Sequence, residues 1–186
     1  MNGEYTAEIV LPPAADRPAN LLASLFDSHY ERIYRLARRL SRGADDALDL
    51  VQETFLRAAR FPSSVPVNKT DQEAWLVRVL VNICRDQWRK SQVRARHAKA
   101  AAGHSPSPGG HDAEAALIAR ATVWRALEAL PPRRRAIVVM FELEGLVVAE
   151  IARLLKINAV TARWHLAMGR RELARALNVS KGEPKR

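Results

Sequence analysis

The chain has 186 residues, of which 48% are hydrophobic, and it carries a formal net charge of +10 with an isoelectric point near 10.6. This composition is too apolar for a wholly disordered chain, and the positive charge favours nucleic acid or an acidic membrane surface as partner. No run approaches the roughly 20 apolar residues that span a bilayer, and the first residues lack the features of a secretory signal. We therefore expect a cytoplasmic protein of one or two small domains.

Proline and glycine residues divide the chain into two helical blocks. Residues 1–19 contain three prolines and no periodic pattern, which predicts a flexible lead. Apolar residues at three-to-four spacing predict one helix over residues 21–40 and a second over residues 45–60. Phe61 and Pro62 end the second helix, and residues 62–69 are expected to form a loop.

The second predicted helix has an acidic and polar stripe opposite its apolar face. Leu48, Val51, Phe55 and Ala58 are expected to point inward. The acidic residues of the stripe have a spacing that could hold a divalent metal ion, although exposed acidic stripes are far commoner than metal sites. The acidic cluster consists of Asp45, Asp46, Asp49 and Glu53, and Gln52 and Arg57 also point outward.

A long third helix is predicted to begin where Thr70 and Glu73 have the spacing of a capping box, directly before an apolar run. Its second face carries tryptophan, asparagine and arginine side chains at helical spacing. Indole rings stack on unpaired bases with roughly 1–3 kcal/mol per base, and guanidinium groups hold phosphates. This face is a candidate site for single-stranded DNA, unless the tryptophans are core residues. It consists of Trp75, Arg78, Asn82, Arg85, Trp88, Arg89 and Lys90.

Residues 98–112 are rich in glycine, serine and proline and predict a flexible linker. The second block, residues 113–178, should begin with a helix that is capped by Asp112 and ends near Ala129. Pro131 and Pro132 interrupt it before a helix over residues 133–143, and a basic tail is expected over residues 179–186.

Residues 144–177 have the pattern of a helix-turn-helix, two amphipathic helices joined by a short turn. A basic outer face on the second helix suits the major groove of DNA, and the alternative is an ordinary helical hairpin with a solvated charged face. The residues expected to face the core are Ala162, Leu166, Gly169, Leu173 and Leu177. Those expected to point outward are Arg163, Trp164, Met168, Arg170 and Arg171.

The chain carries no recognisable catalytic or cofactor-binding motif. Its five histidines are scattered, its single cysteine, Cys84, lies within an apolar run, and phosphate-loop and nucleophile-elbow patterns are absent. We therefore expect no bound metal ion, no cofactor and no catalysis by this chain alone.

Three segments in this order resemble the extracytoplasmic-function (ECF) class of the sigma-70 family of bacterial RNA polymerase sigma factors. They are DALDLVQETFLRA at residues 46–58, AWLVRVLVNICRDQWRK at residues 74–90 and ALEALPPRRRAIVVMFELEGLVVAEIARLL at residues 126–155. The resemblance covers about residues 21–177. It implies an all-α protein in which residues 20–97 form a sigma-2-like domain and residues 113–178 a sigma-4-like domain. It also implies core RNA polymerase, promoter DNA and an anti-sigma factor as partners.

The resemblance also implies roles for particular residues. The stripe on the second helix would dock on core polymerase through Asp46, Asp49, Gln52 and Glu53. The third helix, with the loop over residues 62–69, would bind the -10 element through Asn82, Arg85, Asp86 and Arg89, joined by Trp75, Arg78, Trp88 and Lys90. The helix-turn-helix would bind the -35 element through Thr161, Arg163, Trp164, His165, Met168, Arg170, Arg171 and Arg175.

The helix-turn-helix departs from the family pattern at several positions. Trp164 replaces a serine, His165 replaces an arginine and Met168 replaces a later arginine. Lys156 stands where glycine is usual, so we expect Asn158 to supply any left-handed turn conformation. Two other functions compete with the sigma-factor interpretation: a stand-alone helix-turn-helix repressor or activator, and a metal-dependent DNA-processing enzyme that uses the acidic cluster.

Overall fold

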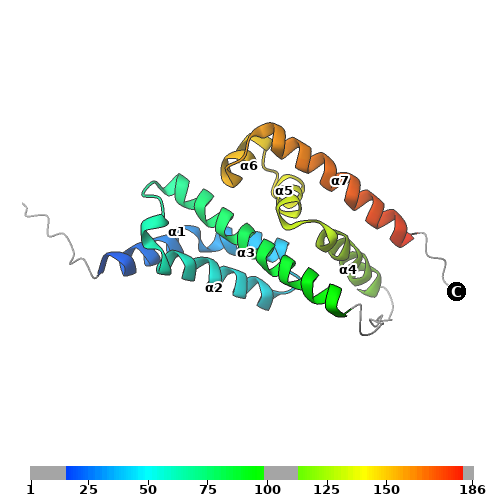
Figure 1. The fold of residues 1–186 in the computed structure, drawn as a ribbon, viewed down its shortest axis with the longest axis horizontal. Coiled ribbons are helices and arrows are strands. Elements are labelled where there is room, and N and C mark those ends of the chain that lie inside the picture. Colours follow the sequence, from blue (N-terminus) through cyan, green and yellow to red (C-terminus); the bar gives the residue numbers. More distant parts are fainter. Residues whose placement is uncertain (1–15, 99–112, 182–186) are drawn as a thin grey trace, which may run out of the picture.

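The computed structural model describes residues 16–98 and 113–181, and these residues are folded as helices and short connections with no strand among them (Figure 1). The predicted all-α class is therefore confirmed. The elements are α1 (Asp16–Leu40), α2 (Ala44–Arg60), the short 3-10 helix η1 (Pro62–Ser64), α3 (Lys69–Ala98), α4 (Ala113–Ala129), α5 (Pro132–Glu142), α6 (Val148–Leu155) and α7 (Ala159–Lys181).

Two helices extend beyond their predicted bounds, into the lead and the tail that the sequence predicts to be flexible. Helix α1 begins at Asp16, four residues inside the predicted lead, with Pro18 in its first turn, where the missing amide hydrogen costs no helical hydrogen bond. Helix α7 continues to Lys181, beyond the predicted start of the basic tail. The rest of the lead (residues 1–15), most of the linker (residues 99–112), the cap residue Asp112 and residues 182–186 lie outside the described residues.

Helices α1, α2 and α3 pack against one another to form the first domain. The inward side chains of α2 follow the predicted spacing only in part. Leu48, which was predicted to point inward, is 38% exposed, whereas Leu50 and Thr54 are buried. The face of α2 that packs against α1 and α3 is therefore rotated about the helix axis from the predicted face. The hydroxyl of Thr54 donates a hydrogen bond of 2.7 Å to the carbonyl of Leu50, which allows a polar side chain to be buried there.

Helix α3 starts differently from the capping box that the sequence predicts. The side-chain oxygen of Asn68 accepts a hydrogen bond of 2.9 Å from the backbone N–H of Thr70, and the Asn68 carbonyl accepts from the N–H of Gln72. Asn68 is therefore the N-cap, and the assignment to Thr70 and Glu73 was wrong. Glu73 instead pairs with Arg32 of α1 at 3.2 Å.

Helices α6 and α7 form the predicted helix-turn-helix, and α5 is the helix that precedes it. Helix α4 packs along α5 and α7. Gly145 has φ +68° in the turn before α6, a conformation that glycine adopts at little cost. The left-handed residue at the end of α6 is Lys156, with φ 52°, and not Asn158. Asn158 is the N-cap of α7, because its side-chain oxygen accepts a hydrogen bond of 2.6 Å from the N–H of Thr161.

The two domains pack on each other within the described residues. Helix α3 lies against α5 and α6, and α1 lies against α5, so that buried side chains of both domains form one continuous apolar core (Figure 1). Helix α7 is the outermost helix of the second domain in this view, on the side away from α2. Helix α3 therefore lies beside the second domain, whereas α7 lies on the outside of that domain.

Charged side chains hold the interface between the domains. The carboxylate of Glu144, in the turn after α5, accepts hydrogen bonds from Arg32 and Arg39 of α1. Arg42, just after α1, pairs with Glu128 of α4 at 2.8 Å. These contacts join the two domains at the C-terminal half of α1 and just beyond its end. The hydrogen bond with Glu128 raises the pKa of Arg42 above its ordinary value.

Arg135 of α5 is the most deeply buried arginine of the described residues, with 7% of its surface exposed. Its guanidinium donates to backbone carbonyls at the ends of two helices, at 3.4 Å to Leu40 of α1 and at 2.9 Å to Glu128 of α4. Burial lowers the pKa of Arg135, and the carbonyl oxygens compensate for part of the lost hydration. The sequence does not indicate which arginine in the run over residues 133–135 is buried.

Candidate nucleic-acid interface

The stripe on α2 lies on the surface, as the sequence predicts. Asp46, Asp49 and Gln52 are exposed, and Glu53 is half-buried. They project from the face of α2 opposite the buried residues Ala47, Leu50 and Val51. An exposed acidic surface on a strongly basic protein suits a protein partner, because it would repel DNA.

Ion pairs connect this stripe to α3. Arg57 of α2 pairs with Glu53 at 3.2 Å in the same helix and lies 3.9 Å from Asp86 of α3. Asp86 also lies 3.8 Å from Arg85. The candidate polymerase-binding residue Glu53 and the candidate -10 residue Asp86 therefore share Arg57 as a charged neighbour, so the two candidate surfaces adjoin there.

The polar face of α3 is only partly open. Arg78 is half-buried and donates a hydrogen bond of 3.3 Å to the carbonyl of Leu154 in α6. Burial lowers the pKa of Arg78, which Asp71 partly offsets. Asn82 is half-buried as well, whereas Arg85, Arg89 and Lys90 are exposed toward the end of the helix. The second domain thus covers the first turns of the face that was predicted to bind DNA.

The two tryptophans of α3 are less accessible than a base-stacking surface requires. Trp75 is half-buried and packs against the apolar core. Trp88 is half-buried too, and its indole N–H is buried without a hydrogen-bond acceptor among the described residues. In this arrangement Trp75 has the role of a core residue, which was the alternative that the sequence left open.

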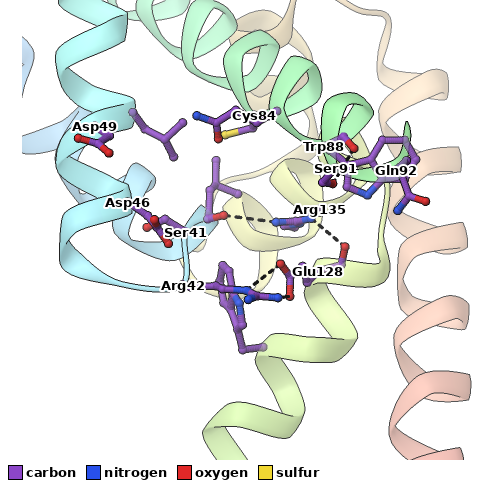
Figure 2. A pocket seen from close by; sticks show the side chains of 14 residues that line it. Ser41, Arg42, Asp46, Asp49, Cys84, Trp88, Ser91, Gln92, Glu128 and Arg135 are labelled. Atoms are coloured by element: carbon purple, nitrogen blue, oxygen red, sulfur yellow. Dashed lines mark hydrogen bonds and ion pairs between the residues drawn. The ribbon is translucent and has the colours of Figure 1, made fainter. Parts of the chain in front are cut away.

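A hollow of about 700 Å³ lies where α2, α3, α4 and α5 meet (Figure 2). Its walls include Asp46 and Asp49 of the acidic stripe on one side and Trp88 on the other, with Arg135 and the Arg42–Glu128 pair between them. Cys84 also lines it, and burial raises the pKa of this thiol to about 11, so the thiol is protonated and unreactive near neutral pH.

Helix α7 has the predicted phase. Ala162, Leu166 and Gly169 are buried, and Arg163, Arg170 and Arg171 are exposed. Trp164 is 53% exposed, so its indole is available to a ligand. Thr161 and Met168 are half-buried and Arg175 is exposed. Trp164 is therefore a surface residue in this structure, as its position in the helix predicts.

The unusual residues of α7 are in contact with one another and with α5. The rings of Trp164 and His165 meet edge to face with centroids 4.9 Å apart. The guanidinium carbon of Arg134 lies 5.5 Å from the centre of the Trp164 ring. Burial, then Arg134 and Arg133, lower the pKa of His165 below its ordinary value, so the imidazole is neutral near pH 7.

Not every arginine of α7 points freely into solvent. Arg170 pairs with Glu142 of α5 at 2.6 Å, and its guanidinium lies 4.9 Å from the ring centre of Phe141. Arg170 is thus held by contacts within the second domain. Arg163, Arg171 and Arg175 are exposed along the same helix.

Comparison with known proteins matches both domains to the same family. Residues 25–94 match sigma-70 region 2 and residues 120–173 match sigma-70 region 4. The chain is 35% identical to the ECF RNA polymerase sigma factor SigM of Mycobacterium tuberculosis over 169 residues, which cover 88% of this chain and 80% of SigM. It is 26% identical to SigW of Bacillus subtilis over 165 residues, which cover 83% and 88% of the two chains.

Solved structures show a similar fold. CnrH, in complex with the cytosolic domain of CnrY, has a TM-score of 0.52 and 22% identity over 89% of this chain and 98% of CnrH. RpoE of Bartonella quintana, in complex with the anti-sigma factor NepR, has a TM-score of 0.51 and 22% identity over 89% and 96% of the two chains.

Two regions of the sigma-70 type, in this order, define a transcription initiation factor. The chain belongs to the ECF class of the sigma-70 family of RNA polymerase sigma factors. It binds core RNA polymerase and promoter DNA, directs promoter recognition and transcription initiation, and is not itself an enzyme. The family therefore decides against a stand-alone repressor or activator and against a DNA-processing enzyme.

Within residues 16–98 and 113–181, no three histidine, cysteine or acidic side chains are grouped so that they could hold a metal ion. None of the helices in these ranges is long and apolar enough to cross a membrane.

Proposed function

We propose that the three surfaces of this sigma factor divide the work of initiation. The stripe on α2, with Asp46, Asp49, Gln52 and Glu53, docks on core RNA polymerase. The polar face of α3 binds the -10 element through Arg78, Asn82, Arg85, Asp86, Arg89 and Lys90, supported from the core side by Trp75 and Trp88. The outer face of α7 binds the -35 element through Thr161, Arg163, Trp164, His165, Met168, Arg170, Arg171 and Arg175.

The exposed outer face of α7 carries this proposal furthest. It lies opposite the buried residues Ala162, Leu166 and Gly169, and it follows a turn whose geometry is fixed by Lys156 and by the Asn158 cap. A helix presented in this way fits the major groove, where arginine and apolar side chains contact base edges and thymine methyl groups.

We infer that the closed arrangement of the domains is the one without polymerase. Arg78 bonds to the α6 backbone and Asn82 is half-buried, so this part of the -10 face is available only after the second domain moves away from α3. Because core polymerase binds the open arrangement more tightly than the closed one, docking shifts the two domains toward separation, and promoter DNA then contacts both domains.

We also propose that an anti-sigma factor holds this protein inactive in the cytoplasm. Solved structures of RpoE and of CnrH contain NepR and CnrY respectively, and both folds resemble this one. The closed interface is a target for such a partner, because a protein that binds only the closed arrangement would keep the Arg78 and Asn82 part of the -10 face covered.

The experiment that tests the proposed function is run-off transcription from genomic fragments with purified core polymerase, with and without this protein. We expect promoter-specific transcripts that require the protein and that disappear with charge reversal on the α2 stripe. Transcripts that are unaffected by variants of all three surfaces would contradict the proposed division of work.

A further inference from the structure

Arg134 of α5 occupies an unusual position beneath the DNA-facing surface of α7. Its side chain is 14% exposed, and its guanidinium carbon lies 5.5 Å from the centre of the Trp164 ring. The same guanidinium pairs with Glu172, two turns further along α7. Arg134 therefore connects Trp164 to a later turn of its own helix by way of α5.

Gly169 makes this close approach possible. A β-carbon at position 169 would lie 2.5 Å from Cγ2 of Val138 and 3.1 Å from Cγ of Arg134. Only glycine allows α7 to pack this tightly on α5, and the tight packing brings the Arg134 side chain under the recognition helix. The close packing of α5 against α7 at Gly169 therefore determines the position of the Arg134 side chain.

Trp164 is a large side chain with half of its surface in solvent, and an unsupported side chain of this kind samples several rotamers. Arg134 contacts one face of the indole and His165 meets its edge. The indole is thus held from two sides, and the ordering that DNA binding would otherwise require is largely complete before DNA arrives.

We propose that Arg134 is a positioning residue for promoter specificity: it fixes the indole of Trp164 so that this ring contacts the same base step each time the -35 element is bound. Arg134 acts through Trp164 and touches no base itself. This inference rests on the proposed role of α7 in binding the -35 element, and it adds a residue from outside the helix-turn-helix to the set that determines which sequence is preferred.

The test is selection of a randomised -35 library by holoenzyme that carries Arg134→Gln, followed by binding measurements on the selected sequence and its single-base variants. A cation–π contact at an exposed site is worth about 0.5–1 kcal/mol. We therefore expect Arg134→Gln to weaken discrimination at the step contacted by Trp164 by roughly two- to fivefold, since 1.4 kcal/mol is tenfold. Arg134→Lys keeps the charge but loses the planar group, and it should restore only part of the discrimination.

Three controls separate positioning from a merely structural role. Arg125→Gln removes an exposed arginine of α4 and should leave the preferred sequence unchanged. Glu172→Gln removes the ion pair but keeps the contact with Trp164, so it should lower thermal stability more than discrimination. In a Trp164→Ala background, Arg134→Gln should have no further effect on discrimination, because the residue acts through the indole.

Two results would overturn the inference: an unchanged preference in Arg134→Gln, or a uniform loss of affinity that adds fully to that of Trp164→Ala. Should Arg134→Gln fail to fold, Arg134→Lys and the double-variant comparison decide in the same way. If wild-type holoenzyme selects no upstream sequence at all, the proposed function of α7 fails instead, and the two failures are thereby distinguished.

Discussion

Arg39 of α1 donates hydrogen bonds to the carboxylate of Glu144 and, at 2.6 Å, to the carbonyl of Leu143, so that it closes the turn after α5 onto the first domain. The Glu144 side chain is only 2% exposed. A carboxylate buried in this way has exchanged its hydration for two arginine partners, and both partners belong to the other domain. The closed arrangement therefore depends on Glu144 more than on any surface ion pair nearby.

The first prediction concerns this contact. Glu144→Gln should weaken the domain interface by about 1–3 kcal/mol, the usual cost of losing charged hydrogen bonds that are partly screened by solvent. Energy transfer between dyes on cysteines introduced at positions 59 and 174, in a Cys84→Ala background, should then report a larger and more variable distance. Glu142→Gln is the matched control, because Glu142 pairs with Arg170 inside the second domain. If the dye distances in Glu144→Gln and Glu142→Gln are equal, Glu144 does not hold the two domains together.

A second prediction concerns the α2 stripe. Charge reversal in Asp49→Lys with Glu53→Lys should weaken binding to core polymerase at least tenfold, because complementary charges become like charges. Stability should change by only about 0.5 kcal/mol at the exposed Asp49, and loss of the Glu53–Arg57 pair should cost about 1 kcal/mol or less. Fluorescence anisotropy with labelled core polymerase measures the affinity. The pair Asp27→Lys with Glu31→Lys changes the net charge equally on α1 and should bind as the wild type does. Equal losses in both pairs would indicate a non-specific charge effect.

The third prediction concerns DNA melting. Asn82→Ala with Arg89→Ala should slow open-complex formation more than initial binding to duplex DNA, since flipping a base out of the stack costs a few kcal/mol that protein contacts must offset. Permanganate footprinting of unpaired thymines measures the melted fraction, with Arg125→Ala as the control. Normal melting with the double variant would mean that these residues serve only the fold.

The helices themselves were predictable from sequence because their apolar residues recur at helical spacing over many turns. Their ends were harder to predict, since Asn68 and Thr70 both resemble caps and only the geometry of the chain decides between them. The contacts between the domains were not predictable. Nothing in the run Arg133, Arg134 and Arg135 indicates that the last is buried, that the second supports Trp164 or that the first is exposed, because those roles depend on which helices meet there.

The sequence was likewise sufficient to predict the faces of the candidate site but not the contacts that cover them. The outward face of α7 follows from its periodicity, and the structure has Arg163, Trp164 and Arg171 on that face. The periodicity of α3 correctly separates its apolar and polar faces, but α6 covers part of the polar face. A contact of this kind joins residues 76 positions apart, and local pattern carries no information about it.

The fourth prediction concerns the recognition helix. Trp164→Ala and Arg163→Ala should change which upstream sequence is preferred, by roughly 1–3 kcal/mol for each lost base contact. Arg171→Ala should lower the affinity for all sequences to a similar extent, because phosphate contacts position the protein without reading bases. A randomised -35 library selected with each holoenzyme separates the two effects. An unchanged preference in Trp164→Ala would place the indole outside the DNA contact.

The central claim is that one chain presents α3 to the -10 element and α7 to the -35 element of the same promoter. Site-specific photo-crosslinking tests it most directly, with a photoreactive amino acid at position 89 or at position 163 in holoenzyme on a selected promoter. We expect crosslinks from position 89 to the non-template strand of the -10 element and from position 163 to duplex DNA of the -35 element. Crosslinks from both positions to one element, or from either position to the other element, would contradict it.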